Sequence, residues 1–206
     1  MLIEENKSLK NYNSFGIDCS ARYYVSVSTV AELKEVLSNT FYKKHFILGG
    51  GSNMLLIQDI DALVIHLNLK GIKVLSENKD SVHILAMAGE NWHEFVLDCI
   101  ENEYGGLENL SLIPGNVGTA PIQNIGAYGV ELKDNFISCT ALEIETQKEI
   151  EFSKAACNFG YRDSIFKKEA KGKYIITGVV FELTKKNHKK RGHGPPRVAR
   201  RAKPLL

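Results

Sequence analysis

Residues 113–129 read IPGNVGTAPIQNIGAYG and show neither a helical nor a strand period. The surrounding segment 105–129 holds six of the 17 glycines and two of the five prolines. Proline fixes φ, and glycine lets a ligand or another segment approach the backbone closely. Loops of this length are uncommon in compact domains unless they have a function. The stretch therefore indicates either a loop that wraps a flat ligand or an Ω-loop packed on itself.

A second glycine-rich stretch, Gly49-Gly-Gly-Ser-Asn53, follows a short apolar strand predicted at Phe46–Leu48. Three consecutive glycines can take positive φ values, so that successive backbone N–H groups converge on an anion. Ser52 and Asn53 add side-chain donors. The stretch is not a G-x-G-x-x-G motif, because Met54 and a predicted strand follow it, and no Lys-Ser/Thr pair makes it a P-loop. It predicts either an anion-binding turn or a plain tight turn.

A third stretch, Phe159-Gly-Tyr-Arg-Asp-Ser-Ile-Phe166, contains one of only two arginines in residues 1–184, where lysine occurs 15 times. Arginine is hard to replace where a planar fork must hold a carboxylate or phosphate. Arg162 is therefore a candidate anion-binding group. The alternative is a structural ion pair with Asp163 or another acid.

The rest of the chain alternates strands and helices. Strands are predicted at residues 23–28, 46–48, 54–57, 63–67, 82–88, 136–145, 148–152 and 174–183. Helices are predicted after Thr29 and Asn91, each followed three residues later by glutamate, and a short one near 153–157. The sum predicts an α+β fold with two lobes that divide near residues 70–71, with domains at 1–70 and 71–184.

The formal net charge of +2 combines two unlike segments. Residues 185–206 contain nine basic residues and no acidic one, which leaves 17 basic against 24 acidic residues, a net of −7, in residues 1–184. This distribution excludes polyanion binding by the whole surface. The composition of 185–206 cannot bury a core, which predicts a disordered or non-native basic tail. The alternative is an arm that binds nucleic acid or a membrane.

Several other classes are excluded. The first residues lack the basic and apolar regions of a signal peptide, and no apolar run is long enough for a membrane span. Four scattered cysteines without C-x-x-C predict buried, reduced thiols and a cytoplasmic protein. The histidines show no metal spacing, so we expect no metal site and structural roles for His45, His66, His83 and His93. Trp92 is expected in the core.

Six motifs together resemble one family. In chain order they are Asn13-Ser-Phe-Gly-Ile17, Leu48-Gly-Gly-Gly-Ser-Asn53, Gly89-Glu-Asn-Trp-His93, Gly106-Leu-Glu-Asn-Leu110, Ile113–Gly129 and Gly160-Tyr-Arg-Asp-Ser-Ile-Phe166. Their order and spacing resemble the UDP-N-acetylenolpyruvoylglucosamine reductases, in the type I branch. The resemblance spans about residues 8–184 and implies an FAD-binding fold of the vanillyl-alcohol oxidase type, with two α+β subdomains that grip the cofactor.

The resemblance also implies site residues. The turn 49–53 would hold the FAD pyrophosphate, and the loop 113–129 would line the FAD and position its isoalloxazine ring. The implied cofactor-binding residues are Gly49, Gly50, Gly51, Ser52, Asn53, Ile113, Pro114, Gly115, Gly118, Thr119, Ala120, Gln123, Asn124, Gly126, Ala127, Tyr128 and Gly129.

The implied reaction reduces UDP-N-acetylglucosamine enolpyruvate to UDP-N-acetylmuramate, for peptidoglycan synthesis. NADPH would reduce the flavin, hydride would pass to the enolpyruvyl C3, and a proton would be added at C2. Arg162 would be catalytic, holding the substrate carboxylate and stabilising the charge that develops there, with Tyr161 beside it in the substrate site.

The sequence departs from this family at its end. Family members continue into a third, substrate-binding domain that carries a serine proton donor and a glutamate, whereas the matching sequence here ends near residues 183–184. The expectation is a C-terminally truncated reductase that binds FAD but does not complete turnover, with weak or absent UDP-sugar binding. The alternative is a non-catalytic FAD-binding module. Neither nucleic acid nor a membrane is expected as a partner, and the oligomeric state is undetermined.

Overall fold

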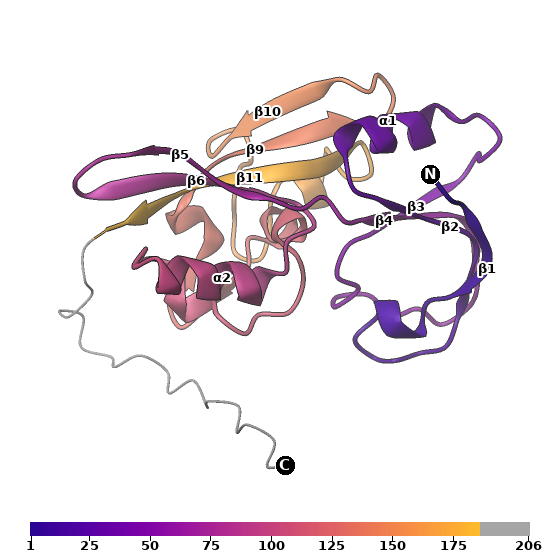
Figure 1. Cartoon of the computed structure of the whole chain (residues 1–206), viewed down its shortest axis with the longest axis horizontal. Helices are drawn as coiled ribbons and strands as arrows, with labels where there is room; N and C mark the ends of the chain where they lie inside the picture. Colours follow the sequence, from indigo (N-terminus) through magenta and orange to yellow (C-terminus); the bar gives the residue numbers. More distant parts are fainter. Residues whose placement is uncertain (186–206) are drawn as a thin grey trace, which may run out of the picture.

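The structure, a computed structural model, describes residues 1–185 and contains two main sheets (Figure 1). The first sheet has the strand order β1-β2-β4-β3, from β1 (Glu4–Ser8), β2 (Ser20–Val27), β3 (His45–Leu48) and β4 (Ile60–Leu67). β4 pairs in parallel with both β2 and β3, and β1 pairs antiparallel to β2. Helix α1 (Val30–Ser38) provides the crossover after β2.

The second sheet is antiparallel, with the order β10-β9-β11-β6-β5. Its strands are β5 (Ile72–Glu77), β6 (Ser81–Met87), β9 (Phe136–Glu143), β10 (Glu149–Ser153) and β11 (Tyr174–Thr184). Helix α2 (Trp92–Glu101) covers one face of this sheet (Figure 1). The segment after α2 contains β7 (Gly126–Ala127), β8 (Val130–Glu131) and short 3-10 turns at Glu108–Leu110, Val117–Thr119, Pro121–Gln123 and Leu132–Asp134. Two further 3-10 turns are at Lys10–Tyr12 and Ile165–Lys167.

Both helices begin where the sequence predicts. Thr29 accepts a hydrogen bond from the backbone N–H of Glu32, whose carboxylate accepts one in return from the Thr29 N–H, which completes a capping box. The Asn91 side chain likewise accepts from the Glu94 N–H at 3.1 Å. Local side-chain chemistry is enough to set these two starts.

The core that joins the two sheets lies beneath α1. Leu33 and Val36 of α1 pack with apolar residues of β2 and β4, and Leu142 and Ile175 of the second sheet belong to the same buried cluster. A larger cluster lies between α2 and the second sheet, where Trp92 and Phe95 meet Phe181 of β11. The two sheets are therefore held together by shared apolar burial.

Some predicted elements are wrong. Residues 54–57 form no strand, and residues 153–157 form a turn closed by the Cys157 N–H and the Ser153 carbonyl. The strands β1 and β5 are not predicted by the sequence. Both are edge strands, and every residue of β5 is exposed, so neither shows a buried face from which a period of two could be read.

The division into domains at 1–70 and 71–184 stays a prediction, although the first sheet takes its strands from residues 4–67 and the second from 72–184. The predicted basic tail lies outside the described residues, apart from Lys185. Within residues 1–185, no helix is long and apolar enough to cross a membrane.

Candidate functional site

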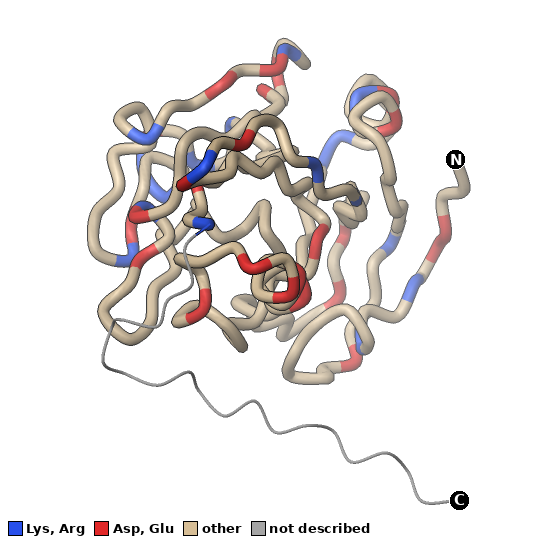
Figure 2. Tube along the Cα trace, turned by 60° about the vertical axis from the view of Figure 1, so that its left-hand side comes forward, with Lys and Arg blue, Asp and Glu red and all other residues tan. Residues whose placement is uncertain are grey.

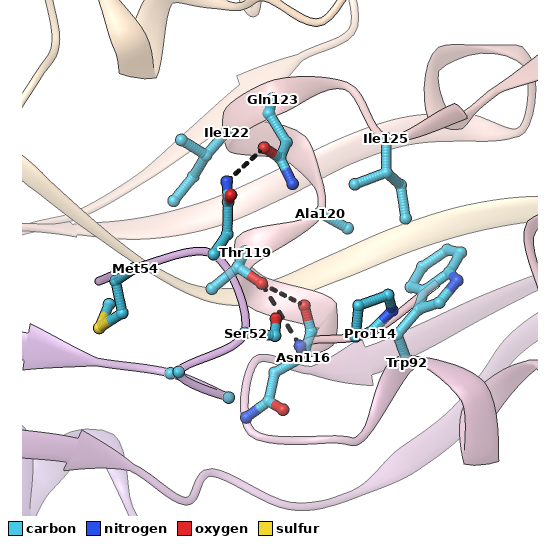
Figure 3. Close-up of a pocket in the computed structure, with 14 residues that line it drawn as sticks. Ser52, Met54, Trp92, Pro114, Asn116, Thr119, Ala120, Ile122, Gln123 and Ile125 are labelled. Carbon is cyan, nitrogen blue, oxygen red and sulfur yellow. Dashed lines mark hydrogen bonds between the residues drawn. The ribbon is translucent and has the colours of Figure 1, made fainter. Parts of the chain in front are cut away.

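A cavity of about 210 Å³ lies where the turn after β3 meets the 3-10 turns that follow α2 (Figure 3). The turn is residues 49–53, and the opposing segment belongs to the 113–129 loop. The cavity is lined by Gly49, Gly50, Gly51, Ser52, Asn53, Met54, Trp92, Pro114, Asn116, Thr119, Ala120, Ile122, Gln123 and Ile125. Two stretches that are separated by about 60 residues in the sequence thus form one site.

The first two glycines of the turn, Gly49 and Gly50, pack closely against the loop. A Cβ at Gly49 would lie 2.8 Å from Thr119 Cγ2, and a Cβ at Gly50 would lie 2.8 Å from Asn116 Oδ1 and 3.1 Å from Gly115 Cα. Any larger residue would push the two walls of the cavity apart. The structure therefore explains Gly49 and Gly50 by contact between the two segments.

The turn also offers unused donors. In the part of the chain that the structure describes, the backbone N–H groups of residues 50–53 donate no hydrogen bond to another protein group. Gly51 has φ +60, the left-handed conformation that glycine adopts readily. Consecutive free N–H groups in such a turn can bind an anion without the help of a cationic side chain.

A hydrogen bond closes one side of the cavity. Asn53 Nδ2 donates to Gln123 Oε1 at 2.7 Å, and Figure 3 shows this bond between the two walls. On the loop, Thr119 Oγ1 donates to the Asn116 carbonyl at 2.8 Å and accepts from the Asn116 N–H at 3.3 Å. The polar lining is thus made of amides and hydroxyls, without a lysine or arginine.

Trp92 forms an apolar wall of the cavity. The side chain is 1% exposed, which confirms its prediction as a core residue. Its Nε1 donates to the Leu110 carbonyl at 2.8 Å, and its backbone N–H donates to the Gly115 carbonyl at 3.0 Å. The first residue of α2 therefore fixes the start of the glycine-rich loop.

Sequence reasoning missed five lining residues as site residues: Met54, Trp92, Asn116, Ile122 and Ile125. Asn116 and the two isoleucines lie inside the stretch 113–129, which the resemblance assigned to FAD only in part. Met54 and Trp92 look like ordinary apolar residues in the sequence. Trp92 belongs to the motif at residues 89–93, to which the resemblance assigned no role, and only the folded backbone brings both residues to the cavity.

Several predicted site residues do not line the cavity. Gly118 faces away from the cavity, where an added Cβ would be 2.5 Å from Ala88 Cβ, whereas a Cβ at Gly115 would lie 3.1 Å from the hydroxyl of the lining residue Ser52. Gly126 and Ala127 form β7, and Tyr128 is 88% exposed beyond it. The predicted residues outside the lining are Ile113, Gly115, Gly118, Asn124, Gly126, Ala127, Tyr128, Gly129, Tyr161 and Arg162.

Arg162 lies on a separate turn beside the same loop. Its Nη2 donates to the Gly126 carbonyl at 2.5 Å, and it makes no ion pair within the described residues. Asp163, the partner considered for it, pairs instead with Lys168, and the hydrogen bond from Lys168 lowers the pKa of the Asp163 carboxyl. Tyr161, 85% exposed, lies next to the Arg162 guanidinium. The guanidinium thus keeps donors for an external anion.

Charged side chains do not gather by sign in the described part of the chain. Figure 2 shows basic and acidic residues interspersed along the trace of residues 1–185. No group of three or more His, Cys, Asp or Glu side chains in this part could hold a metal ion.

Two of the histidines expected to have structural roles differ in their hydrogen bonding. His66 Nδ1 lies 3.0 Å from the Tyr24 hydroxyl, and burial lowers the pKa of His66. His45 departs from expectation, because its buried Nε2 has no hydrogen-bond partner.

Comparison with known proteins gives one consistent result. A family model described as FAD binding domain matches residues 21–147. The UDP-N-acetylenolpyruvoylglucosamine reductases of Flavobacterium johnsoniae and Amoebophilus asiaticus are 59% and 51% identical to this chain, over 92% and 90% of its length. The chain spans about half the length of these curated relatives, 56% and 55%.

Two solved structures are similar in fold. The crystal structure of UDP-N-acetylenolpyruvylglucosamine reductase from Thermus caldophilus has a TM-score of 0.72 and 25% identity, and covers 89% of this chain and 62% of its own. A solvent-stable cholesterol oxidase has a TM-score of 0.61 over 85% of this chain and 37% of its own. At 12% identity, the likeness to the oxidase concerns the fold alone.

Proposed function

This chain belongs to the FAD-binding domain family, and from that premise we propose that it is the FAD-binding part of an NADPH-linked reductase. The proposed substrate is UDP-N-acetylglucosamine enolpyruvate, and the proposed product is UDP-N-acetylmuramate. The observation that carries the proposal is the cavity between the turn 49–53 and the loop 113–129, whose two walls are in contact through glycines.

The residues present fit the diphosphate part of FAD. Pockets that hold a whole drug-sized ligand measure about 300 to 1,000 Å³, so a cavity of about 210 Å³ suits a fragment of a dinucleotide. The free N–H groups of residues 50–53 and the side chains of Ser52 and Asn53 would bind the phosphate oxygens. Ile122, Ile125 and Trp92 supply apolar surface next to these donors. For Ala127, Tyr128 and Gly129, contact with the flavin ring stays a prediction.

Arg162 is proposed to bind the carboxylate of the substrate. When bound, FAD supplies the transfer of hydride between NADPH and the substrate. The planar guanidinium fork matches a carboxylate, and its positive charge stabilises negative charge that develops there. The bond to Gly126 leaves the rest of the fork free, and the exposed Tyr161 ring beside it is proposed to complete the substrate side.

The proposed setting follows from this function. The reaction belongs to the synthesis of a cell-wall precursor, so we propose a cytoplasmic location and a UDP-sugar as the partner of the complete site. Neither nucleic acid nor a membrane is proposed as a partner. A non-catalytic FAD-binding module remains the alternative, and the experiment below separates it from the reductase.

The chain contains one tryptophan, which provides the test. Because Trp92 lines the cavity, bound FAD should quench its fluorescence by energy transfer, and titration gives the dissociation constant. The substitution Gly50→Ala, which forces apart the cavity walls, should weaken FAD binding at least tenfold. Gly172→Ala, at a glycine with nothing within 4 Å of its added Cβ, is the matched control and should leave FAD affinity unchanged.

Turnover is measured separately, as NADPH oxidation with UDP-N-acetylglucosamine enolpyruvate and formation of UDP-N-acetylmuramate. FAD binding without NADPH oxidation supports the non-catalytic module, whereas NADPH oxidation by the FAD-bound chain, with or without product formation, supports the reductase part. Absence of FAD binding by the wild-type chain would overturn both readings.

A further inference from the structure

The turn that carries Arg162 has an unusual backbone. Gly160 and Asp163 exchange backbone hydrogen bonds at 3.0 and 3.3 Å, which leaves Tyr161 and Arg162 at the tip. Arg162 has φ 53, in the left-handed region that non-glycine residues seldom occupy. Such a conformation persists only where its surroundings hold it. The position of the guanidinium therefore depends on the contacts that fix this turn.

Asn124 supplies one of these contacts from the cavity loop. The side chain is fully buried, at 0% exposure. Its Nδ2 donates to the Gly160 carbonyl at 2.9 Å, and its Oδ1 accepts from the Lys133 N–H at 3.1 Å. Both ends of the amide make a bond inside the protein, and because the residue is fully buried the amide is not exposed to a ligand.

Two further bonds join the same segments. Ser164, 1% exposed, donates from Oγ to the Ile122 carbonyl at 2.7 Å, and Arg162 itself bonds to the Gly126 carbonyl. The turn 160–164 is thus linked at three points to residues 122–126, and Ile122 and Ile125 of that segment line the cavity. The wall of the cavity and the base of the Arg162 turn are one hydrogen-bonded unit.

We infer that Asn124 is a positioning residue, which holds Arg162 at a fixed place relative to the cavity and does not contact FAD. This positioning role rests on the proposed function in one respect, that Arg162 binds an anion. Asn124 has φ 43, and asparagine is among the few residues that take this conformation readily. The left-handed backbone conformation at residue 124, which asparagine tolerates and most residues do not, therefore orients the side-chain amide.

The test is the nearly isosteric variant Asn124→Asp. Aspartate tolerates the same φ and keeps the acceptor for Lys133, but an ionised carboxylate cannot donate to Gly160. Hydrogen exchange at the peptide covering residues 159–165 should accelerate about tenfold near neutral pH. Modification of Arg162 by phenylglyoxal should accelerate by a similar factor relative to Arg22, which is held by Asp61. FAD affinity should change by less than about twofold.

A pH profile separates a lost donor from a general structural defect. A protonated carboxyl group donates again, so protection of the turn, corrected for intrinsic exchange rates, should return as pH falls. The charged groups on the packed segments are Lys133, paired with Glu131, Arg162 itself, Asp163, paired with Lys168, and Lys167, whose Nζ donates to the Arg162 carbonyl at 2.9 Å. The same charged groups are present in the wild-type protein. Its corrected protection from hydrogen exchange at residues 159–165 should therefore not rise as the pH falls.

Asn135→Asp is the matched control. Asn135 Nδ2 donates to the Gly106 carbonyl at 2.9 Å, so the variant loses the same kind of bond elsewhere in the second sheet region. It should leave exchange at residues 159–165 and the reactivity of Arg162 unchanged. Equal effects of the two variants, or protection that does not return with acid, would overturn the inference.

Failure of the proposed function has a different signature. If the wild-type chain does not bind FAD while Asn124→Asp still loosens the Arg162 turn, the cofactor assignment is wrong and the positioning role stands. If Asn124→Asp weakens FAD binding at least tenfold and leaves the turn unchanged, Asn124 belongs to the cofactor site and the positioning role is wrong.

Discussion

The carbonyl oxygen of Tyr12 lies 1.9 Å from the place where a Cβ at Gly51 would stand. Gly51 also has φ +60, and its own carbonyl accepts a hydrogen bond from the Ser14 N–H at 3.2 Å. The turn that lines the cavity is therefore packed directly against the segment between β1 and β2. The first sheet region and the cavity depend on each other at this point.

Gly51→Ala should lower the free energy of unfolding by about 3 kcal/mol, through left-handed strain and displacement of the Tyr12 backbone. Urea denaturation measures the change. Gly16 is the matched control, because it has φ +63 and nothing within 4 Å of its added Cβ. Gly16→Ala should cost only the conformational part, about 1 kcal/mol. Equal losses at the two glycines would contradict the contact with Tyr12.

The four cysteines should be unreactive in the folded protein. All are free and buried. The hydrogen bond with Cys157, followed by burial, raises the pKa of Cys139, and burial raises the pKa of Cys99 to about 12. Since the thiolate is the reactive form, a disulfide reagent at mildly alkaline pH should label no cysteine until urea is added, and then all four. Rapid labelling without urea would contradict their burial.

His45 should destabilise the protein, and increasingly so in acid. Its buried Nε2 has no partner, and burial lowers the pKa of the imidazole. The unfolded state therefore binds a proton first as pH falls below about 6.5, so stability declines with falling pH until the folded pKa is passed. His45→Phe should raise the free energy of unfolding by about 1 kcal/mol at neutral pH and reduce the acid loss.

The control for this prediction is His83→Phe, since the His83 side chain is 40% exposed and lies 3.6 Å from Glu182. Urea denaturation at several pH values should show little stabilisation for this variant. A stability profile of His45→Phe parallel to that of the wild type would show that His45 does not cause the acid loss.

Arg162→Lys should leave FAD binding intact. Arg162 does not line the cavity, so the FAD dissociation constant from Trp92 quenching should change by less than about twofold. Lysine lacks the planar fork, and it should weaken binding of a carboxylate substrate at least tenfold where the wild-type chain binds it. Loss of FAD affinity as large as that of Gly50→Ala would mean that the guanidinium contacts the cofactor.

The sequence could predict the local features well. The caps at Thr29 and Asn91, the buried reduced cysteines and the buried Trp92 depend on neighbouring residues or on apolar character, and the structure confirms them. The comparisons confirm the α+β, FAD-binding fold of the vanillyl-alcohol oxidase type that the ordered motifs predicted.

Elements without a buried face could not be predicted. β1 and β5 are formed by pairing with a neighbouring strand, and the apolar residues 54–57 remain outside any strand although their side chains suit one. In these places pairing partners decide the structure, and partners far along the chain leave no period in the local sequence.

The sequence by itself determined which stretches are special: the turn 49–53, the loop 113–129 and the turn around Arg162. Only the tertiary structure decided which of these stretches contact one another and through which residues. Gly50 must be glycine because Asn116 and Gly115 approach it, and Asn124 faces inward because Gly160 lies against it. Contacts of this kind form across 36 to 66 residues of chain and depend on how the two sheets pack, which no spacing of residues along the sequence records.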